Sequence, residues 1–313
     1  MFGVLAVVPI FTHSNLYIMN ILIMCLVWGV VAAAWDLIMG LAGIFTFAQI
    51  AFFAVGGYTS AMICGTTGLT PWLGMLIGGL VAAIFGVLVG IPCLNLKGSY
   101  VALVTFAFHM LLEPFIKSDL GKSIGTGGPQ GLISIPAFKI GNYTFSSMEP
   151  IAPYFVAFFL ALIFLLIIYW IIHSPLGLAF VSLRDSELFG KSIGIDDFKY
   201  KLLVFAISAF ITGVMGGFYA HYVGMMSSRT LLGLELFIFL MLMLVAGGMG
   251  RFPGALLGAF IVTIVGEFLR PLETYRMLIF GALIMLFIAK MPQGILGVVF
   301  DRMVKSKGYE SQY

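Results

Sequence analysis

Long apolar runs separated by short polar segments extend along the whole chain. An α-helix needs about 20 apolar residues to cross a bilayer core of about 30 Å, because each residue rises about 1.5 Å. Nine such runs lie at 16–38, 44–64, 72–94, 98–116, 152–172, 202–222, 233–249, 254–269 and 275–290. The pattern predicts an all-α fold, a polytopic transmembrane helical bundle of about nine spans, or ten if the apolar residues 1–11 form another.

The run at 44–64 is the least regular of the nine. Thr46, Gln49 and Tyr58 stand among its apolar residues, so we expect this span to be broken or re-entrant. Polar side chains within a span usually face another helix or a water-filled cavity. These three side chains are therefore candidates for lining a translocation path.

Two hydrophilic segments, 117–150 and 173–201, are long enough to be more than connectors. If the nine spans alternate across the membrane, ten of the 16 Lys and Arg residues lie on the side of 173–201 and six on the other. Cytoplasmic loops carry the excess of these residues. We therefore expect 173–201 and the tail 291–313 to be cytoplasmic and 117–150 to be external. We expect no soluble domain, so residues 1–313 are predicted to form a single transmembrane domain.

Composition excludes several functions. Apolar residues make up 61% of the chain and charged residues only 9%, against about 25% charged residues in an average soluble domain. So few charges cannot cover a soluble fold, which excludes a soluble enzyme, a nucleic-acid-binding protein and a disordered regulator. The net charge of +3 comes from scattered residues rather than a basic stripe. The three cysteines are far apart, which argues against a metal site or a disulfide framework.

Neither nucleotide binding nor catalysis is indicated. Residues 121–123 and 190–192 read Gly-Lys-Ser, but neither triplet has the glycine that a P-loop needs five residues earlier. We therefore expect this chain to bind no cofactor and to be no enzyme. The ionisable residues considered for intramembrane chemistry are Asp36, His109, Glu113, Glu235 and Glu267. The four acids lie near predicted span ends, where the energetic cost is small, so interfacial anchoring or packing explains them.

The segment 173–201 has the pattern of a short amphipathic helix. Ser182 and Asp185 form a start signal, and Gly194 is placed to end the helix. The apolar stripe consists of Leu176, Phe180 and Leu183. The charged face, whose spacing allows favourable pairs, consists of Arg184, Glu187 and Lys191. Such a helix at the cytoplasmic surface either anchors the chain at the interface or docks a cytoplasmic partner.

A glycine-rich stretch interrupts the external segment at 125–132. Four glycines surround one proline, which is typical of a tight turn rather than a flexible linker. Its centre consists of Thr126, Gly127, Gly128, Pro129 and Gln130. The turn is a candidate docking face for an external protein or a gate, and plain surface structure is the alternative.

A set of short runs along the chain is typical of one permease family: 36–43, 53–61, 96–105, 126–132, 174–177, 184–187, 194–195, 200–203, 247–250 and 292–297. With these runs the chain resembles the permease subunits of branched-chain amino acid ABC importers, specifically the M-type subunit. The runs occur in collinear order over nearly the whole chain, and the ordered set is more specific than any single run. Departures are the few residues before Thr12, Gln-Ile-Ala at 49–51 where relatives often have Gly-His-Ala, and the bulky Phe180 and Val181. They bear on the substrate more than on the class.

The resemblance implies a heteromeric importer of leucine, isoleucine and valine in the inner or plasma membrane. This subunit would pair with a second, homologous permease, and an external binding protein would deliver the substrate. Two cytoplasmic ATPases, which use ATP and Mg²⁺, would dock on 173–201. The implied coupling residues are Arg184, Asp185, Glu187, Lys191 and Gly194.

Two alternatives stay open at this stage. Close relatives of similar sequence transport urea or short amides, so the substrate class has a second candidate. A stand-alone secondary transporter is the other alternative. It should carry buried ion-coupling carboxylates near mid-membrane and show an inverted repeat, and neither feature is clear in the sequence.

Overall fold

The computed structural model describes residues 15–94, 96, 98–140, 143–145, 150–291, 294–295 and 297. Helices occupy all nine predicted runs: α2 (Leu16–Asp36), α3 (Gln49–Thr67), α4 (Pro71–Leu94), α5 (Ser99–Lys117), α7 (Ile151–Ile172), α10 (Asp197–Val223), α12 (Leu234–Gly247), α13 (Gly254–Phe268) and α14 (Glu273–Lys290). The predicted all-α bundle is therefore confirmed. Residues 1–11 and most of the predicted tail 291–313 lie outside the described residues.

Seven helical segments of the described chain are long and apolar enough to cross a membrane. They are Leu16–Leu41, Gln49–Thr67, Pro71–Leu94, Ser99–Lys117, Ile151–Ile172, Asp197–Val223 and Ser228–Gly247. The first of them includes η1 (Leu37–Leu41), a π-helix that continues α2. The remaining two runs form helices that do not meet this criterion, and of these α13 is apolar but has only 15 residues.

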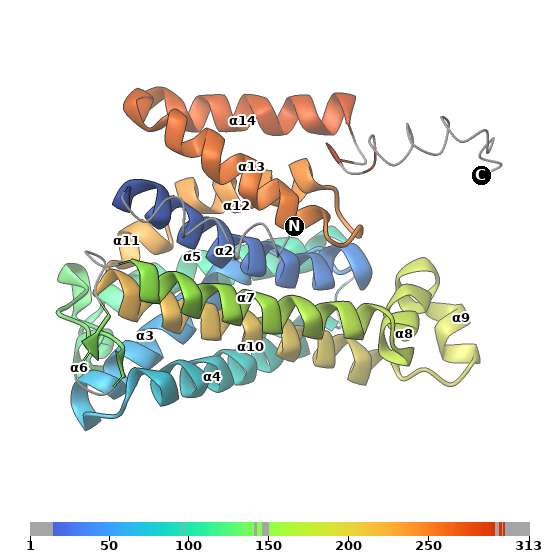
Figure 1. Ribbon diagram of the computed structural model, residues 1–313. Helices are drawn as coiled ribbons and strands as arrows, with labels where there is room; N and C mark the ends of the chain where they lie inside the picture. Colours follow the sequence, from blue (N-terminus) through green and yellow to red (C-terminus); the bar gives the residue numbers. More distant parts are fainter. Residues whose placement is uncertain are drawn as a thin grey trace.

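Shorter helices lie at the two ends of the bundle. One end carries α6 (Asp119–Ile124) and α11 (Ser228–Leu231), and the other carries α8 (Pro175–Asp185) and α9 (Glu187–Ser192) (Figure 1). We call these the α6 end and the α9 end. Two small antiparallel pairs complete the described structure: β1 (Leu132–Ile133) with β4 (Met225–Met226), and β2 (Lys139–Ile140) with β3 (Tyr143–Thr144). Two 3₁₀ turns lie at Gly128–Gln130 and Arg270–Leu272.

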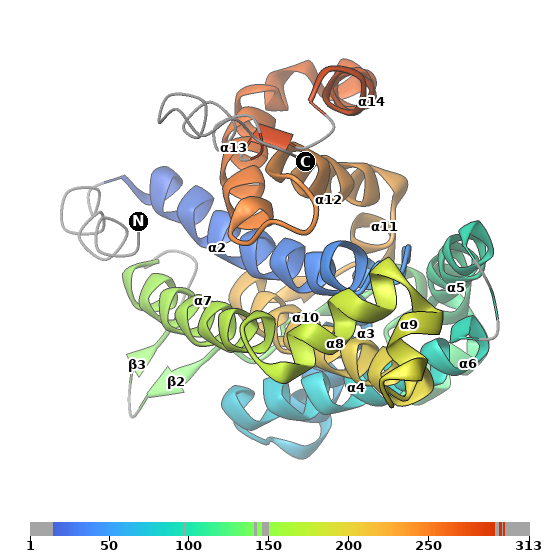
Figure 2. The same cartoon turned by 90° about the vertical axis from the view of Figure 1, so that its right-hand side faces the viewer.

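Helix α2 runs through the middle of the molecule (Figure 1). It packs against α13 on one side and against α7 and α10 on the other. Helix α10 also packs along α4 and α3, whereas α12 joins α13 and α14. Figure 2, which looks along the bundle from the α9 end, shows α14 at the outer edge beyond α12 and α5 at a second edge. The buried helix α2 therefore lies between the group α12–α14 and the group that contains α3, α4, α7 and α10.

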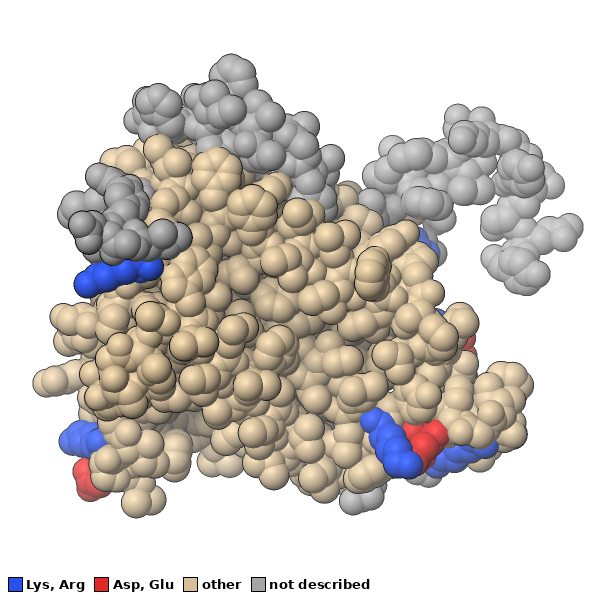
Figure 3. Space-filling model, turned by 60° about the horizontal axis from the view of Figure 1, so that its bottom comes forward, with Lys and Arg blue, Asp and Glu red and all other residues tan. Residues whose placement is uncertain are grey.

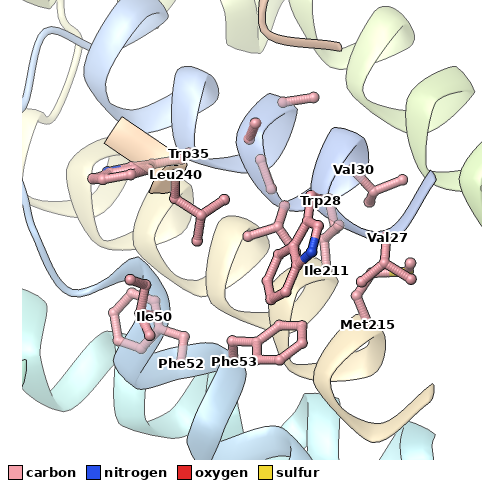
Figure 4. Packing of buried hydrophobic residues seen from close by; sticks show 14 of the residues in the cluster. Val27, Trp28, Val30, Trp35, Ile50, Phe52, Phe53, Ile211, Met215 and Leu240 are labelled. Atoms are coloured by element: carbon pink, nitrogen blue, oxygen red, sulfur yellow. The ribbon is translucent and has the colours of Figure 1, made fainter. Parts of the chain in front are cut away.

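Large apolar side chains make the central contacts of α2. The ring centroid of Trp28 lies 5.1 Å from that of Phe53 in α3 and 5.9 Å from that of Tyr219 in α10. Figure 4 shows Trp28 reaching from α2 toward Phe53, with Val27 and Met215 packed beside them. Lipid tails are as apolar as these side chains, so van der Waals contact between closely packed helices stabilises the bundle.

Glycines let α3, α4 and α10 approach one another closely. A Cβ atom on Gly56 would overlap the backbone of Gly213 in α10, and one on Gly78 would overlap the carbonyl of Gly56. The glycines spaced four apart at Gly213 and Gly217 thus face neighbouring helices of the same chain. The lack of a Cβ atom at these positions serves helix packing within the subunit.

Charged side chains avoid the middle of the bundle surface. On the face shown in Figure 3, a broad band without Lys, Arg, Asp or Glu separates the charged groups at the two ends. The hydrocarbon layer of a bilayer covers such a band without desolvating charge. The arrangement agrees with a multi-pass membrane protein.

The expected irregularity of the run 44–64 is confined to its first residues. Residues 49–67 form one regular helix, α3, and the irregular backbone lies before it, between Ala42 and Ala48. Protein groups satisfy this irregular segment: Trp35 Nε1 donates to the carbonyl of Thr46 at 2.8 Å, and the amide of Phe47 donates to Thr105 Oγ1 at 2.9 Å. Non-helical backbone at membrane depth is tolerated where protein surrounds it.

Candidate functional site

The segment between α7 and α10 consists of two short helices rather than one. Helix α8 starts at Pro175, not at Ser182, whose hydroxyl donates to the Leu178 carbonyl within the helix at 2.7 Å. Helix α9 follows after a break at Ser186, whose Oγ accepts from the amide of Phe189 at 3.2 Å. The predicted single helix starting at Ser182 is therefore wrong, because Ser186 competes as the N-cap. The predicted end is confirmed: Gly194 has φ +85°, and its amide donates to the Lys191 carbonyl at 3.1 Å.

The charged residues of α9 pair with α10 rather than with one another. Glu187 forms an ion pair with Lys201, and Lys191 lies 3.0 Å from Asp197 Oδ2. The Asp197 carboxylate raises the pKa of Lys191 by hydrogen bonding and by its charge. The expected pairs along one helix face are therefore replaced by pairs between two elements. Sequence reasoning missed Asp197 and Lys201 because their approach depends on how the chain turns back after Gly194.

The N-terminus of α10 is also capped by a charged side chain. Asp196 Oδ1 accepts from the Lys199 amide at 3.2 Å, and Asp196 Oδ2 lies 3.0 Å from Lys199 Nζ. These interactions with Lys199 lower the pKa of the Asp196 carboxyl. The first turn of α10 is thus held both by its ion pairs with α9 and by the Asp196 cap.

Apolar side chains are left open to solvent on α9 and at Ile193, which follows its last residue. Leu188 is 83% exposed, Phe189 59% and Ile193 56%. Three large apolar groups on so short a segment, beside charges that already have partners, are characteristic of an interaction surface. We call Leu188, Phe189 and Ile193 the α9 patch.

Arg184 connects α8 to the helical bundle. Its Nε donates to Asp185 Oδ1 at 2.9 Å, and its Nη1 donates to the carbonyl of Gly40 at 3.0 Å. The aliphatic part of the side chain lies against Gly43, where a Cβ atom would overlap it. Arg184 therefore points partly inward, toward the π-helical end of α2, and not only toward a partner.

The π-helical end of α2 connects in turn to the loop between α12 and α13. A Cβ atom on Gly40 would overlap the backbone of Gly250, and the Gly250 amide donates to Asp36 Oδ1 at 2.7 Å. Asp36 is only 7% exposed, so of its two expected roles packing is confirmed and interfacial anchoring is not. Insertions that create π-turns are frequent at functional positions. Arg184, Gly40, Asp36 and Gly250 form a continuous series of contacts, which we call the Arg184 link.

A cavity of about 400 Å³ lies beside this link. It is bounded by Arg184 and Glu187 of the α8–α9 segment, by Gly43 and Phe45, and by Val101 of α5. The space leaves the α8–α9 segment unsupported on this side.

The three residues predicted to line a path are buried inside the subunit. Gln49 Nε2 donates to Ser208 Oγ at 3.1 Å and also to Thr212 Oγ1, and Ser208 Oγ donates to the Ala34 carbonyl at 2.6 Å. This network joins α2, α3 and α10. Thr46 Oγ1 accepts from the Ala48 amide at 3.4 Å, and Tyr58 donates to the Met226 carbonyl at 3.5 Å. In this conformation their polar atoms serve helix packing, and a role in the path stays a prediction.

The predicted tight turn of the external segment is confirmed. Gly127, Gly128 and Gly131 have φ of +73°, +59° and +73°, a region that favours glycine. Thr126 is buried and donates its hydroxyl to the Ile116 carbonyl at 2.9 Å. Pro129 and Gln130 are exposed. The turn thus presents a fixed surface at the α6 end, and a docking role for it stays a prediction.

His109, one of the residues considered for intramembrane chemistry, lies in the apolar interior of the bundle. Its ring is fully buried against Phe106 and Phe237, with centroid distances of 6.2 and 5.9 Å, and neither ring nitrogen has a hydrogen-bond partner. Glu113, one turn away, pairs with Lys117 at 2.5 Å instead. Within the described residues, no group of three or more His, Cys, Asp or Glu side chains is placed to hold a metal ion.

Comparison with known proteins decides the class. A family model described as the permease component of the branched-chain amino acid transport system matches residues 17–288. The chain belongs to this permease family. The M-type resemblance is also supported: the chain is similar to the high-affinity branched-chain amino acid transport system permease protein LivM of Escherichia coli, at 31% identity over 88% of this chain and 69% of the relative. LivM of Salmonella typhimurium gives 30% identity over the same shares.

A third relative widens the range of substrates seen among similar proteins. The nucleoside ABC transporter permease protein NupC of Lactococcus lactis is 26% identical over 62% of each chain. No solved structure matches the chain. The class is thus a multi-pass transport permease of the LivM type, whereas its own substrate and partners are a matter for proposal.

Proposed function

We propose that this chain is the M-type membrane subunit of an ATP-driven importer of leucine, isoleucine and valine. Family membership over residues 17–288 carries the proposal. The subunit is not itself an enzyme, binds no cofactor, and works in a cell membrane with separate ATPases that use ATP and Mg²⁺. A second, homologous permease and an external substrate-binding protein complete the assembly. A stand-alone secondary transporter is not favoured, because the relatives are permease proteins of such transport systems.

In the proposed orientation the α9 end is cytoplasmic and the α6 end is external. The excess of Lys and Arg on the side of 173–201 supports this orientation. The ATPases then dock on α8–α9, and the binding protein approaches the turn formed by Thr126, Gly127, Gly128, Pro129 and Gln130.

The two kinds of side chain on α8–α9 suggest a division of roles. Arg184, Asp185, Glu187 and Lys191 already have partners within the chain, so their main role is to hold the segment rigid and attached to α10 and η1. The α9 patch supplies the apolar contact area that an ATPase would cover. Desolvated apolar anchors surrounded by polar groups are the usual arrangement at protein interfaces.

Transport follows if ATP-driven closure of the ATPases displaces the α8–α9 segment. A rigid segment attached through Arg184 to the end of α2 passes that displacement to the most buried helix and, through Asp36, to the α12–α13 loop. A ligand or partner shifts a two-state bundle only through contacts that differ between the states. We assign this role to the Arg184 link, through which ATP hydrolysis would drive alternating access.

A docking test uses Leu188→Asp, with the matched control Leu120→Asp on α6, where the leucine is 68% exposed at the opposite end. We expect the first variant to reduce co-purification of the ATPases with the permease pair by about tenfold or more, as loss of a central apolar anchor does. The control should retain them. Equal retention in both variants would refute docking on α9. Glu187→Lys is a less specific test, because it places a second cation beside Lys201.

The substrate is tested with the complete assembly in proteoliposomes. ATP-dependent uptake of labelled leucine, isoleucine and valine is measured alongside urea, a short amide and a nucleoside. Saturable uptake of the three amino acids supports the proposal. Uptake of urea or an amide alone would move the chain to the second substrate class, and nucleoside uptake would group it with the NupC relative.

A further inference from the structure

A cavity of about 470 Å³ opens between α2, α11, α12 and α14. Arg229, Glu235 and Arg276 contribute charged groups to its lining, and Trp28, Leu236 and Phe239 contribute apolar ones. Its volume lies within the range of small-molecule sites, about 300–1,000 Å³. Nothing in the coupling mechanism uses these residues.

The cavity reaches from the α6 end toward the middle of the bundle. Arg229 lies on α11, which Figure 1 places at that end, whereas Trp28 lies twelve residues into α2. Twelve helical residues span about 18 Å, so Trp28 is well below the end of the helix. Trp28 in turn contacts Phe53 and Tyr219 of the central core. The cavity thus leads from the proposed external surface to the buried helix that the Arg184 link moves.

Its positive charge is only partly balanced. Arg276 Nη1 lies 3.5 Å from Glu235 Oε1, and the Arg276 guanidinium stands 5.8 Å from the ring centroid of Phe239 and 5.4 Å from that of Phe280. Arg276 Nε is buried and has no hydrogen-bond partner. Arg229 forms no ion pair with any residue that the structure describes. Among the residues that line the cavity, two guanidinium groups therefore face one carboxylate. Glu267 also interacts electrostatically with Arg276 but does not line the cavity.

We infer that this cavity receives the free substrate as a zwitterionic α-amino acid with an apolar side chain, an inference that rests on the function proposed above. The substrate carboxylate binds the guanidinium groups of Arg229 and Arg276, because planar guanidinium forks match carboxylates. The substrate ammonium binds Glu235. The branched side chain packs against Trp28, Leu236 and Phe239.

The charges discriminate between classes of ligand. Urea and a nucleoside carry no charge at neutral pH and leave the two guanidinium groups and the carboxylate unused. An anionic lipid headgroup meets the arginines but is repelled by Glu235. An ammonium and a carboxylate on one small molecule satisfy all three groups, and the apolar wall then selects the side chain.

The test uses the complete wild-type assembly in proteoliposomes, with a photoreactive diazirine analogue of leucine as the probe. After illumination during ATP-driven transport, mass spectrometry locates the adducts. We expect labelling within 234–239 or at Trp28, competed by leucine. Arg229→Gln and Glu235→Gln should each lower the adduct yield and the uptake rate by about tenfold, the effect of losing one charge-assisted contact. Arg270→Gln is the matched control at the same end, since Arg270 pairs with Glu267 outside the cavity lining.

The possible results distinguish failure of the cavity assignment from failure of the proposed function. If wild type takes up none of leucine, isoleucine and valine, the proposed function fails and this assignment fails with it. If wild type transports leucine but labelling falls outside the cavity, or the two variants label as wild type does, only the cavity assignment is overturned. If anionic lipid co-purifies with wild type but not with Arg229→Gln, and the probe leaves the cavity unlabelled, the cavity is a lipid site and the assignment is overturned.

Discussion

Replacing Arg184 tests whether the α8–α9 segment drives the bundle through the Arg184 link. Arg184→Ala removes the hydrogen bond from Nη1 to the Gly40 carbonyl, whose length is 3.0 Å, together with the contact of its aliphatic part on Gly43. The apolar patch of α9 is untouched by this change. Docking of the ATPases should therefore persist while the displacement they cause reaches α2 less efficiently.

The magnitude follows from the geometry of that contact. A hydrogen bond from a charged donor contributes about 1.5–3 kcal/mol. The Arg184 side chain is 38% exposed, so water competes and the lower end, about 1.5 kcal/mol, applies. A coupling free energy of that size corresponds to about a tenfold change in the equilibrium between the two states of the bundle. We therefore expect about tenfold less substrate moved per ATP hydrolysed.

The assay measures leucine uptake and phosphate release in the same proteoliposomes, which contain both permeases, the ATPases and the binding protein. Arg184→Lys should give an intermediate ratio, because one ammonium group cannot serve the Gly40 carbonyl and Asp185 in the geometry of a guanidinium. Lys199→Ala is the control, since Lys199 is 80% exposed and its carboxylate partner is Asp196, three residues earlier in the chain. An unchanged uptake-to-ATP ratio in an assembled Arg184→Ala complex would refute the link.

Three further changes test the packing and capping of the bundle. Gly56→Ala should lower the free energy of unfolding in detergent by about 1–3 kcal/mol, because the added Cβ overlaps the α10 backbone. Gly65→Ala in the same helix is the control, since its added Cβ meets no atom and should stabilise the helix slightly. Equal thermal stability of the two variants would contradict the close helix contact. Asp36→Ala leaves the Gly250 amide of the α12–α13 loop without its acceptor and should lower the free energy of unfolding by about 1–3 kcal/mol. Asp36→Asn keeps an acceptor oxygen and should cost less. An equal loss in both variants would assign the effect to the lost charge rather than to the hydrogen bond. Because the pKa of Asp196 is lowered in the folded protein, its cap stabilises α10 fully above the unfolded-state pKa of about 3.9, and this stabilisation is lost as the pH falls through the folded-state pKa. Amide hydrogen exchange at the start of α10 should therefore speed up in acid. Asp196→Asn should remove this pH dependence, and a dependence that persists in this variant would contradict the assignment to Asp196.

Helix positions were determined by local sequence. The length of each apolar run sets whether a helix can form and where it ends, and glycine at 68 and 224 closes α3 and α10 with φ of +69° and +76°. The same local logic predicted the turn around Gly127 and the end of α9 at Gly194. It also predicted an irregular run at 44–64, but the irregular backbone is confined to residues before Gln49. Helix α3 itself stays regular because polar Gln49 finds partners on α10, 159 and 163 residues away.

Only the tertiary structure decided which side chains meet. The spacing of Arg184, Glu187 and Lys191 is compatible with one charged helix face, yet the chain turns at Ser186 and pairs Glu187 with Lys201. Asp36 lies near the end of an apolar run, but the crossing of α2 with the α12–α13 loop buries it on the Gly250 amide. Apolar periodicity is a property of neighbouring residues, whereas ion pairs and cavities depend on how distant helices cross, and that crossing is set by the combined packing of all of them.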